Sequence, residues 1–218
     1  MAKKRLVMIH TVHSLPRSFG ALCDELLPGV EVEHVVDEDM LRETLQAGQL
    51  TDAVRQRFAE HARAALATRP DAVVLTCSSV GPAADGTEVH RIDAAMADRA
   101  VQLGANVGVA ATVPTTLSAT SDLIRRAAER AGKTVEIRTE LAEGAFAALG
   151  RGETDVHDRL VRAALEKLAA WADVVVLAQA SMARALAGAT EVEAAGRRVP
   201  LLTSPRLGVE RLRELLGA

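Results

Sequence analysis

The sequence predicts an α/β protein of two pseudo-symmetric lobes, each a four-stranded parallel sheet flanked by helices, with a site in the cleft between them. Three observations predict this fold class: an internal repeat, short strand-like apolar runs, and helical patterns between those runs. The length of 218 residues accommodates two such lobes. We expect an N-lobe over residues 1–100, joined by a C-terminal helix over 206–218, and a C-lobe over 101–205.

The repeat is clearest in two runs that have the pattern of buried strands. Residues 71–75 read DAVVL and residues 173–177 read DVVVL, and small polar residues follow both runs. Continuous β-branched runs of this kind are typical of strands buried on both faces of a parallel sheet. Three further pairs of segments recur in the same order: 6–12 with 107–113, 30–32 with 135–137, and 89–93 with 199–203. The ordered set indicates an internal duplication with four strands in each half.

Helical patterns occupy the gaps between these strands. Apolar residues recur at helical spacing, and strands that alternate with helices imply right-handed crossovers and a parallel sheet in each half. A last helix from Val209 to Leu216 is expected to return and pack on the first lobe. The other predicted helices cover residues around 19–27, 54–66, 116–131 (with Gly132 as the C-cap) and 156–171.

Composition and charge argue against several classes of protein. A net charge of −3 with well-mixed signs, together with only 2% aromatic residues, is unlike a nucleic-acid-binding protein. No apolar run is long enough for a signal peptide or a membrane span, and two cysteines cannot form a disulfide framework. We therefore expect a cytoplasmic protein with no nucleic-acid partner and no membrane partner.

Candidate site residues lie where the predicted strands end, because ligands of open parallel sheets bind beyond the carboxyl ends of the strands. The sequence has no Gly-rich phosphate loop there. Hydroxyl groups and helix N-termini at these ends suit a carboxylate, so we expect a small carboxylate or carbonyl substrate. The first strands end at His10, Thr11 and Thr112, with Thr115 and Thr116 following, and the third strands end at Cys77, Ser78, Ser79, Gln179 and Ser181.

These strand ends resemble the aspartate/glutamate/hydantoin racemase superfamily over essentially the whole chain. The resemblance rests on TCSSVG around Cys77, ATVPTT at 111–116 and VVVLAQASMA at 174–183. It implies a cofactor-independent enzyme, and homodimers are usual among such proteins. In this family a cysteine at the third strand end of each lobe faces the substrate α-carbon. One thiolate removes a proton and the other thiol returns one.

The resemblance also implies roles for individual residues. Cys77 occupies the first cysteine position, and His10–Thr11 falls where glutamate racemases place an Asp-Ser pair beside that cysteine. Thr112, Thr115 and Thr116 match the carboxylate-binding threonines of the family. Separately, a thiol with an ordinary pKa is mostly protonated at pH 7, so we expect His10 to lower the pKa of Cys77.

The chain departs from the family pattern at Gln179, which stands where the second cysteine is expected. A glutamine side chain forms hydrogen bonds but does not exchange protons near neutral pH. The chain is therefore similar to one-cysteine relatives, the arylmalonate decarboxylases and maleate isomerases, although the decarboxylases keep the cysteine of the second lobe. The leading hypothesis is a cofactor-independent isomerase or decarboxylase type enzyme that uses Cys77 for proton transfer or nucleophilic attack. The alternatives are a racemase with a different second acid and a non-catalytic binding protein.

Other polar residues have simpler structural interpretations. Cys23 lies on a helical apolar stripe and is expected in the core. His10 and His13 have the spacing of metal ligands, but no third ligand has recognisable spacing, so no metal is expected. His157 is expected to cap the long second-lobe helix. Asp37, Glu38 and Asp93 are read as helix caps or general bases, and Arg206 either presents a cation to the substrate or turns the chain.

Overall fold

The computed structural model describes residues 3–218 and confirms the predicted α/β fold, with two sheets flanked by helices. The chain divides into two compact units. The first unit contains the residues up to Ala94 together with Pro205–Ala218, and the second contains Ala95–Ser204. No helix among residues 3–218 is both long enough and apolar enough to cross a membrane.

The first sheet has four parallel strands in the order β2-β1-β3-β4. Its central strands β1 and β3 are continuous apolar runs, as expected for strands covered on both faces. The fourth strand is shorter than predicted and pairs with β3 through only two residues. The strands are β1 (Arg5–His10), β2 (Glu31–Val36), β3 (Ala72–Leu75) and β4 (His90–Arg91).

The second sheet repeats this order as β6-β5-β7-β9 and adds β8 at its edge, antiparallel to β9. The same strand order in both halves agrees with an internal duplication. The added strand belongs to a hairpin that the sequence repeat does not predict. The strands are β5 (Asn106–Ala111), β6 (Glu136–Leu141), β7 (Val174–Leu177), β8 (Glu191–Ala194) and β9 (Arg197–Thr203).

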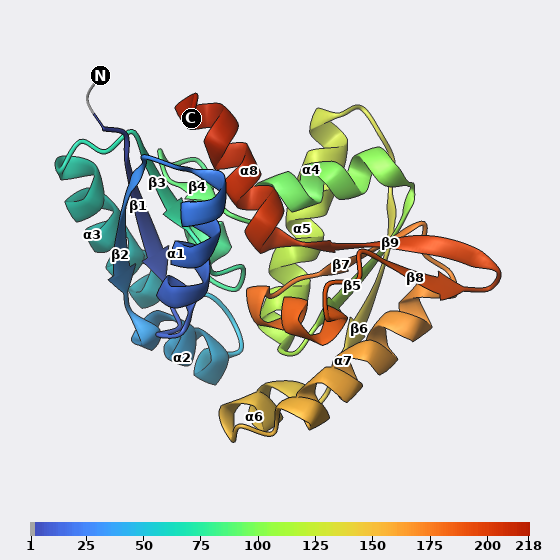
Figure 1. Cartoon of the computed structure of the whole chain (residues 1–218). Helices are drawn as coiled ribbons and strands as arrows, with labels where there is room; N and C mark the ends of the chain where they lie inside the picture. Colours follow the sequence, from blue (N-terminus) through green and yellow to red (C-terminus); the bar gives the residue numbers. More distant parts are fainter. Residues whose placement is uncertain (1–2) are drawn as a thin grey trace. The chain divides into compact units, whose positions relative to one another are not determined.

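Helices cover both faces of each sheet. In the first unit α1 and α3 lie on opposite faces of the sheet, and in the second unit α5 and α7 do so (Figure 1). The structure also contains α2, α4 and α6, which the apolar periodicity did not single out. The helices are α1 (Leu15–Leu26), α2 (Glu38–Ala47), α3 (Asp52–Ala67), α4 (Ala94–Leu103), α5 (Pro114–Arg130), α6 (Ala145–Gly150), α7 (Thr154–Ala169) and α8 (Ser204–Leu216), and two 3₁₀ helices are η1 (Gly81–Ala83) and η2 (Ala180–Leu186).

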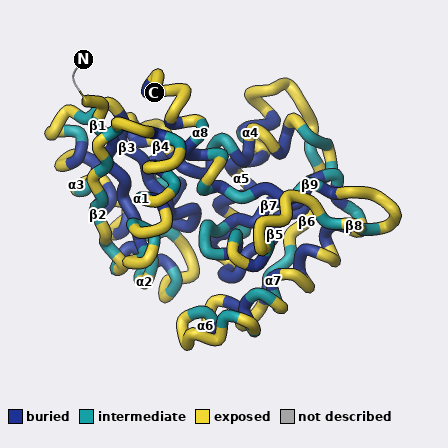
Figure 2. The backbone as a smooth tube through the Cα atoms, in the orientation of Figure 1, coloured by how far each residue is buried: buried dark blue, intermediate teal, exposed yellow. Residues whose placement is uncertain are grey.

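Each unit packs its helices against the buried central strands, which are dark blue in Figure 2. In the first unit Val7, Ile9 and Leu75 pack against Phe58 and other residues of α2 and α3. In the second unit the buried stripe of α7 packs on β5, β7 and β9. Cys23 is buried on α1, and burial raises the pKa of its thiol to about 11, as expected for a core residue.

Helix α8 packs within the first unit, although it follows the whole second unit in sequence. Arg206 forms an ion pair with Glu25 of α1, with Nη2–Oε1 and Nη2–Oε2 distances of 2.9 and 3.0 Å. Gly208 lies so close to Ile92 that a Cβ atom at this position would be 2.4 Å from the Ile92 carbonyl oxygen. The Arg206 side chain therefore joins two helices of the first unit.

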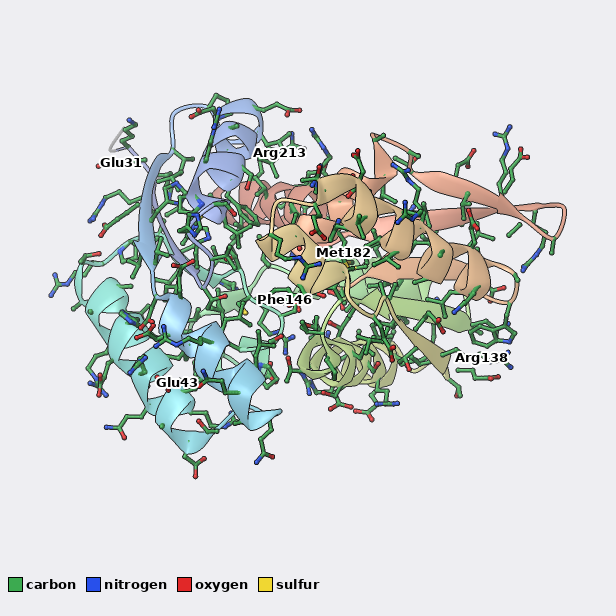
Figure 3. The ribbon with its side chains drawn as sticks, turned by 90° about the horizontal axis from the view of Figure 1, so that it is seen from below. Glu31, Glu43, Arg138, Phe146, Met182 and Arg213 are labelled. Carbon is green, nitrogen blue, oxygen red and sulfur yellow. The ribbon has the colours of Figure 1, made fainter. Side chains whose placement is uncertain are left out.

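The outer strand of the second sheet carries a contact of the single tryptophan. Arg138, labelled in Figure 3, lies on β6, and its guanidinium carbon is 4.1 Å from the centre of the Trp171 ring. Met182, also labelled, lies in η2 and is fully buried with the α7 stripe. The segment that follows β7 is thus packed onto α7.

Candidate functional site

The carboxyl edge of the first sheet places Cys77 beside Thr11. Leu75 pairs with Ile9, and the Thr76 N–H donates to the Ile9 carbonyl oxygen at 3.0 Å. Two residues beyond this pair, Cys77 and Thr11 occupy neighbouring places at the edge of the sheet. Cys77 is buried and belongs to the apolar cluster on the α3 side.

The thiol of Cys77 lies within reach of backbone donors from its own loop. Burial raises the pKa of the thiol above its ordinary value. The side chain of Thr11 and the N–H groups of Val80 and Ser79 oppose this rise, whereas the charge of Asp93 adds to it. The Thr11 hydroxyl makes no hydrogen bond of good geometry with any residue that the structure describes, so we regard its contact with the thiol as weak. The neutral thiol is therefore the resting form at neutral pH.

His10 has partners other than Cys77. The Thr76 hydroxyl donates to the Ile9 carbonyl oxygen at 3.2 Å, so it accepts from Nδ1–H of His10 at 2.9 Å. The Nε2 atom of His10 then accepts from Nδ1–H of His34, also at 2.9 Å. Burial, and after it the neighbouring His34, lowers the pKa of His10 to about 4. A fully buried, neutral His10 with both nitrogens bonded gives no support to the expectation that it lowers the pKa of Cys77.

A buried ion pair lies behind the loop that carries Cys77. Arg91 donates from Nε and Nη2 to the two carboxylate oxygens of Asp93, at 3.0 and 2.9 Å, and from Nη1 to Asp85 at 3.2 Å. The side chains of Arg91 and Asp93 are 5% and 2% exposed. Asp93 is therefore held by an arginine and is not a free general base. The sequence signal for this ion pair is an arginine two residues before the aspartate.

The second unit has the same arrangement at its sheet edge, with Gln179 in place of the cysteine. Leu177 pairs with Ala110, and Ala178 N–H donates to the Ala110 carbonyl oxygen, so Gln179 lies beside Thr112. The Oε1 atom of Gln179 accepts two hydrogen bonds from Thr112, one from N–H at 2.6 Å and one from Oγ1 at 2.9 Å. Both donors of Thr112 are thus used by Gln179, and the Gln179 amide is left with its two N–H donors for other partners.

The remaining predicted residues lie at the same two edges. Ser78 and Ser79 are buried in the turn after Cys77. Thr115 and Thr116 are buried in the first turn of α5, which has no side-chain cap. Ser181 is half-buried in η2. The structure thus brings Thr11, Ser78 and Ser79 together with Cys77, and Thr112 together with Gln179. That the two edges share one cleft stays a prediction.

Several of the other polar residues have structural partners. His157 does not cap α7: its Nδ1 atom bonds the Asp158 carboxylate at 2.7 Å, and its buried Nε2 atom has no partner among the described residues. Asp37 caps α2 by accepting from Asp39 N–H at 3.0 Å, which supports the helix-cap interpretation. Glu38 bonds His13. Among residues 3–218, no three metal-ligating side chains come together.

Comparison of the sequence with known proteins gives no match to any family model or to any curated protein. Solved structures, in contrast, match over nearly the whole chain. A glutamate racemase from Bacillus anthracis matches with a TM-score of 0.71 at 15% identity, covering 99% of this chain and 83% of that protein. An aspartate racemase from Picrophilus torridus matches with a TM-score of 0.68 at 10% identity, covering 98% of this chain and 94% of that one.

A third match is an allantoin racemase from Klebsiella pneumoniae, with a TM-score of 0.61 at 17% identity, covering 98% of this chain and 88% of that protein. The three matched proteins are racemases of amino acids and of allantoin. Identities this low establish the fold alone. The resemblance stated from the strand ends is confirmed at that level, because the chain has the fold of these glutamate, aspartate and allantoin racemases.

Proposed function

We propose that the chain is a cofactor-independent enzyme of the isomerase or decarboxylase type that acts on a small carboxylate through Cys77. The observation that carries the proposal is the environment of the thiol at the carboxyl end of β3. The N–H groups of Ser79 and Val80 reach the sulfur and oppose the effect of burial on its pKa. Such donors stabilise the charge that the sulfur acquires when it gives up its proton.

In this proposal the neutral thiol of Cys77 acts as an acid. A substrate that loses carbon dioxide next to a carboxylate becomes an enolate, whose electron pair takes the proton from Cys77 Sγ. The sulfur is left as a thiolate, stabilised by the Ser79 and Val80 N–H groups, and regains a proton from water. The raised pKa of the thiol, which burial causes, favours this role over that of a resting thiolate.

Gln179 has a different role in this proposal, because its amide does not exchange protons. Its Oε1 atom is held by Thr112, so the group that it offers a ligand is an N–H donor. We assign this donor to a carboxylate or enolate oxygen. With one proton carrier and one hydrogen-bond donor, the reaction delivers its proton to one face of the substrate.

The experiment is a turnover screen of amino acids, hydantoins, arylmalonates and maleate with the wild type, Cys77→Ala and Cys23→Ala. We expect Cys77→Ala to abolish turnover with little change in melting temperature, and Cys23→Ala to retain it. Turnover that survives in Cys77→Ala would rule out the mechanism. An active substrate is then incubated in D₂O. Deuterium in one enantiomer only would support single-face protonation, whereas loss of optical rotation would indicate racemisation with another second acid.

A non-catalytic binding protein is the outcome if no compound is turned over. In that case a thermal-shift screen with the same acids should reveal a ligand, and Cys77 should react with thiol reagents no faster than a free cysteine. Binding in both the wild type and Cys77→Ala, with no turnover in either, would replace the enzyme proposal with this one.

A further inference from the structure

We infer that the buried Arg91–Asp93 ion pair is a positioning element for Cys77: it holds the loop that carries the thiol and balances the charge that the thiol experiences. The inference rests on the proposed role of Cys77 and adds residues that act through it. Neither Arg91 nor Asp93 is assigned to contact the substrate.

The geometry ties the pair to the loop at two places. At Gly81 a Cβ atom would lie 2.6 Å from the guanidinium carbon of Arg91, so the guanidinium packs directly against the loop backbone. At Asp85, just beyond η1, the carboxylate accepts from Arg91 Nη1 at 3.2 Å. Arg91 therefore holds the part of this loop from Gly81 to Asp85 against β4.

The bidentate contact with Asp93 keeps the guanidinium in place. Two nearly parallel hydrogen bonds of 3.0 and 2.9 Å join a planar donor to a planar acceptor, the geometry that arginine makes and lysine does not. A separate cation, Arg55 of α3, donates to the Pro82 carbonyl oxygen at 3.1 Å. The charged groups around the Cys77 loop are therefore Arg91 on β4, Asp93 after it, Asp85 after η1 and Arg55 on α3.

The charge balance follows from the same arrangement. Asp93 is close enough to the sulfur for its charge to raise the pKa of the thiol. Without Arg91, the Asp93 carboxylate would destabilise the Cys77 thiolate more strongly, because buried surroundings screen charges poorly. A buried ion pair is weak support for stability, since apolar side chains of similar volume often stabilise as well. Its effect on the neighbouring thiol gives the pair a role that apolar side chains would lack.

The test is a titration of the Cys77 thiol by its thiolate absorbance, in a Cys23→Ala background so that one thiol remains. We expect Asp93→Asn to lower the thiol pKa by about 1 unit and Arg91→Met to raise it by about 1 unit. A pair that only stabilised the loop would give shifts of the same sign in both variants. Arg42→Met is the matched control, because this exposed arginine of α2 pairs with Asp39, and the thiol pKa should not change.

Two further variants keep the test decisive if Arg91→Met does not fold. Arg91→Lys keeps the charge but loses the bidentate contact, so it should raise the thiol pKa by less than Arg91→Met does. Gly81→Ala should displace the guanidinium and also raise the thiol pKa. Shifts of the same sign in Asp93→Asn and Arg91→Met, or no shift in Asp93→Asn, would overturn the inference. Failure of the proposed function would be seen separately, as turnover by Cys77→Ala, because the titration needs no substrate.

Discussion

Two helical glycines of the first unit, Gly20 in α1 and Gly208 in α8, should respond oppositely to the same substitution with alanine. Both lie inside helices, where alanine is favoured over glycine by about 1 kcal/mol. Their surroundings differ. A Cβ atom at Gly20 would find His34 Nε2 at 3.7 Å, an ordinary contact, whereas a Cβ atom at Gly208 would lie 2.4 Å from the Ile92 carbonyl oxygen.

The magnitudes follow from these distances. For Gly20→Ala we expect the free energy of unfolding to rise by up to about 1 kcal/mol, because only the helix preference changes. For Gly208→Ala the overpacking costs about 1 to 3 kcal/mol or more, because the partner is a backbone atom and α8 itself must move. After subtraction of the helix preference, we expect a net loss of up to about 2 kcal/mol.

The assay is urea denaturation followed by circular dichroism, supported by the melting temperature, which shifts by about 2 to 4 °C per kcal/mol for a chain of this size. Stabilisation by Gly20→Ala together with destabilisation by Gly208→Ala would support the close packing of α8 on the end of β4. Equal stabilisation by the two substitutions would refute it, because Gly208 would then have no close backbone neighbour.

Two further predictions concern the strand ends. Burial lowers the pKa of His10 to about 4 in the folded chain, so below about pH 6.5 the unfolded chain takes up a proton at this residue while the folded chain does not. The free energy of unfolding therefore falls as the pH drops below 6.5, by about 2 kcal/mol at pH 5. Denaturation at both pH values should show a weaker pH dependence in His10→Gln, and an unchanged dependence would contradict the assignment. Thr112→Val removes one hydrogen bond to Gln179, so it should lower the free energy of unfolding by about 1 kcal/mol and weaken substrate binding. Thr112→Ser keeps the hydroxyl and should retain both the stability and the binding. Equal KM values in the two variants would exclude a role for this hydrogen bond.

The fold could be predicted from the sequence because the strand-like apolar runs occur twice in the same order. The runs 71–75 and 173–177 recur at matching places in an ordered set, and the strand order of both sheets agrees with that set. Where the local pattern is weak, the prediction was incomplete. The strand around His90 is held by only two pairs, and β8 is an exposed edge strand whose charged residues give no buried-strand pattern.

The places of the candidate residues at the strand ends were predicted from the sequence, whereas their side-chain partners were not. The repeat placed Cys77 and Gln179 after the third strand of each half, and they follow β3 and β7 in the structure. Side-chain partners depend on which face each residue occupies. His10 contacts Phe19 of α1 and His34, whereas Cys77 belongs to the apolar cluster on the α3 side of the sheet. The order of the residues at a strand end does not show on which face each side chain lies.

The two units carry chemically different side chains at the same position after the third strand, Cys77 in one and Gln179 in the other. At the first edge the side chain beside Thr11 is a thiol, which can lose a proton and is surrounded by donors that would stabilise the resulting charge. At the second edge the side chain beside Thr112 is an amide, whose oxygen is already fully occupied and which can only donate. Racemisation needs a proton carrier on each face of the substrate, and an amide cannot serve as one. The proposed function therefore assigns proton transfer to Cys77 alone.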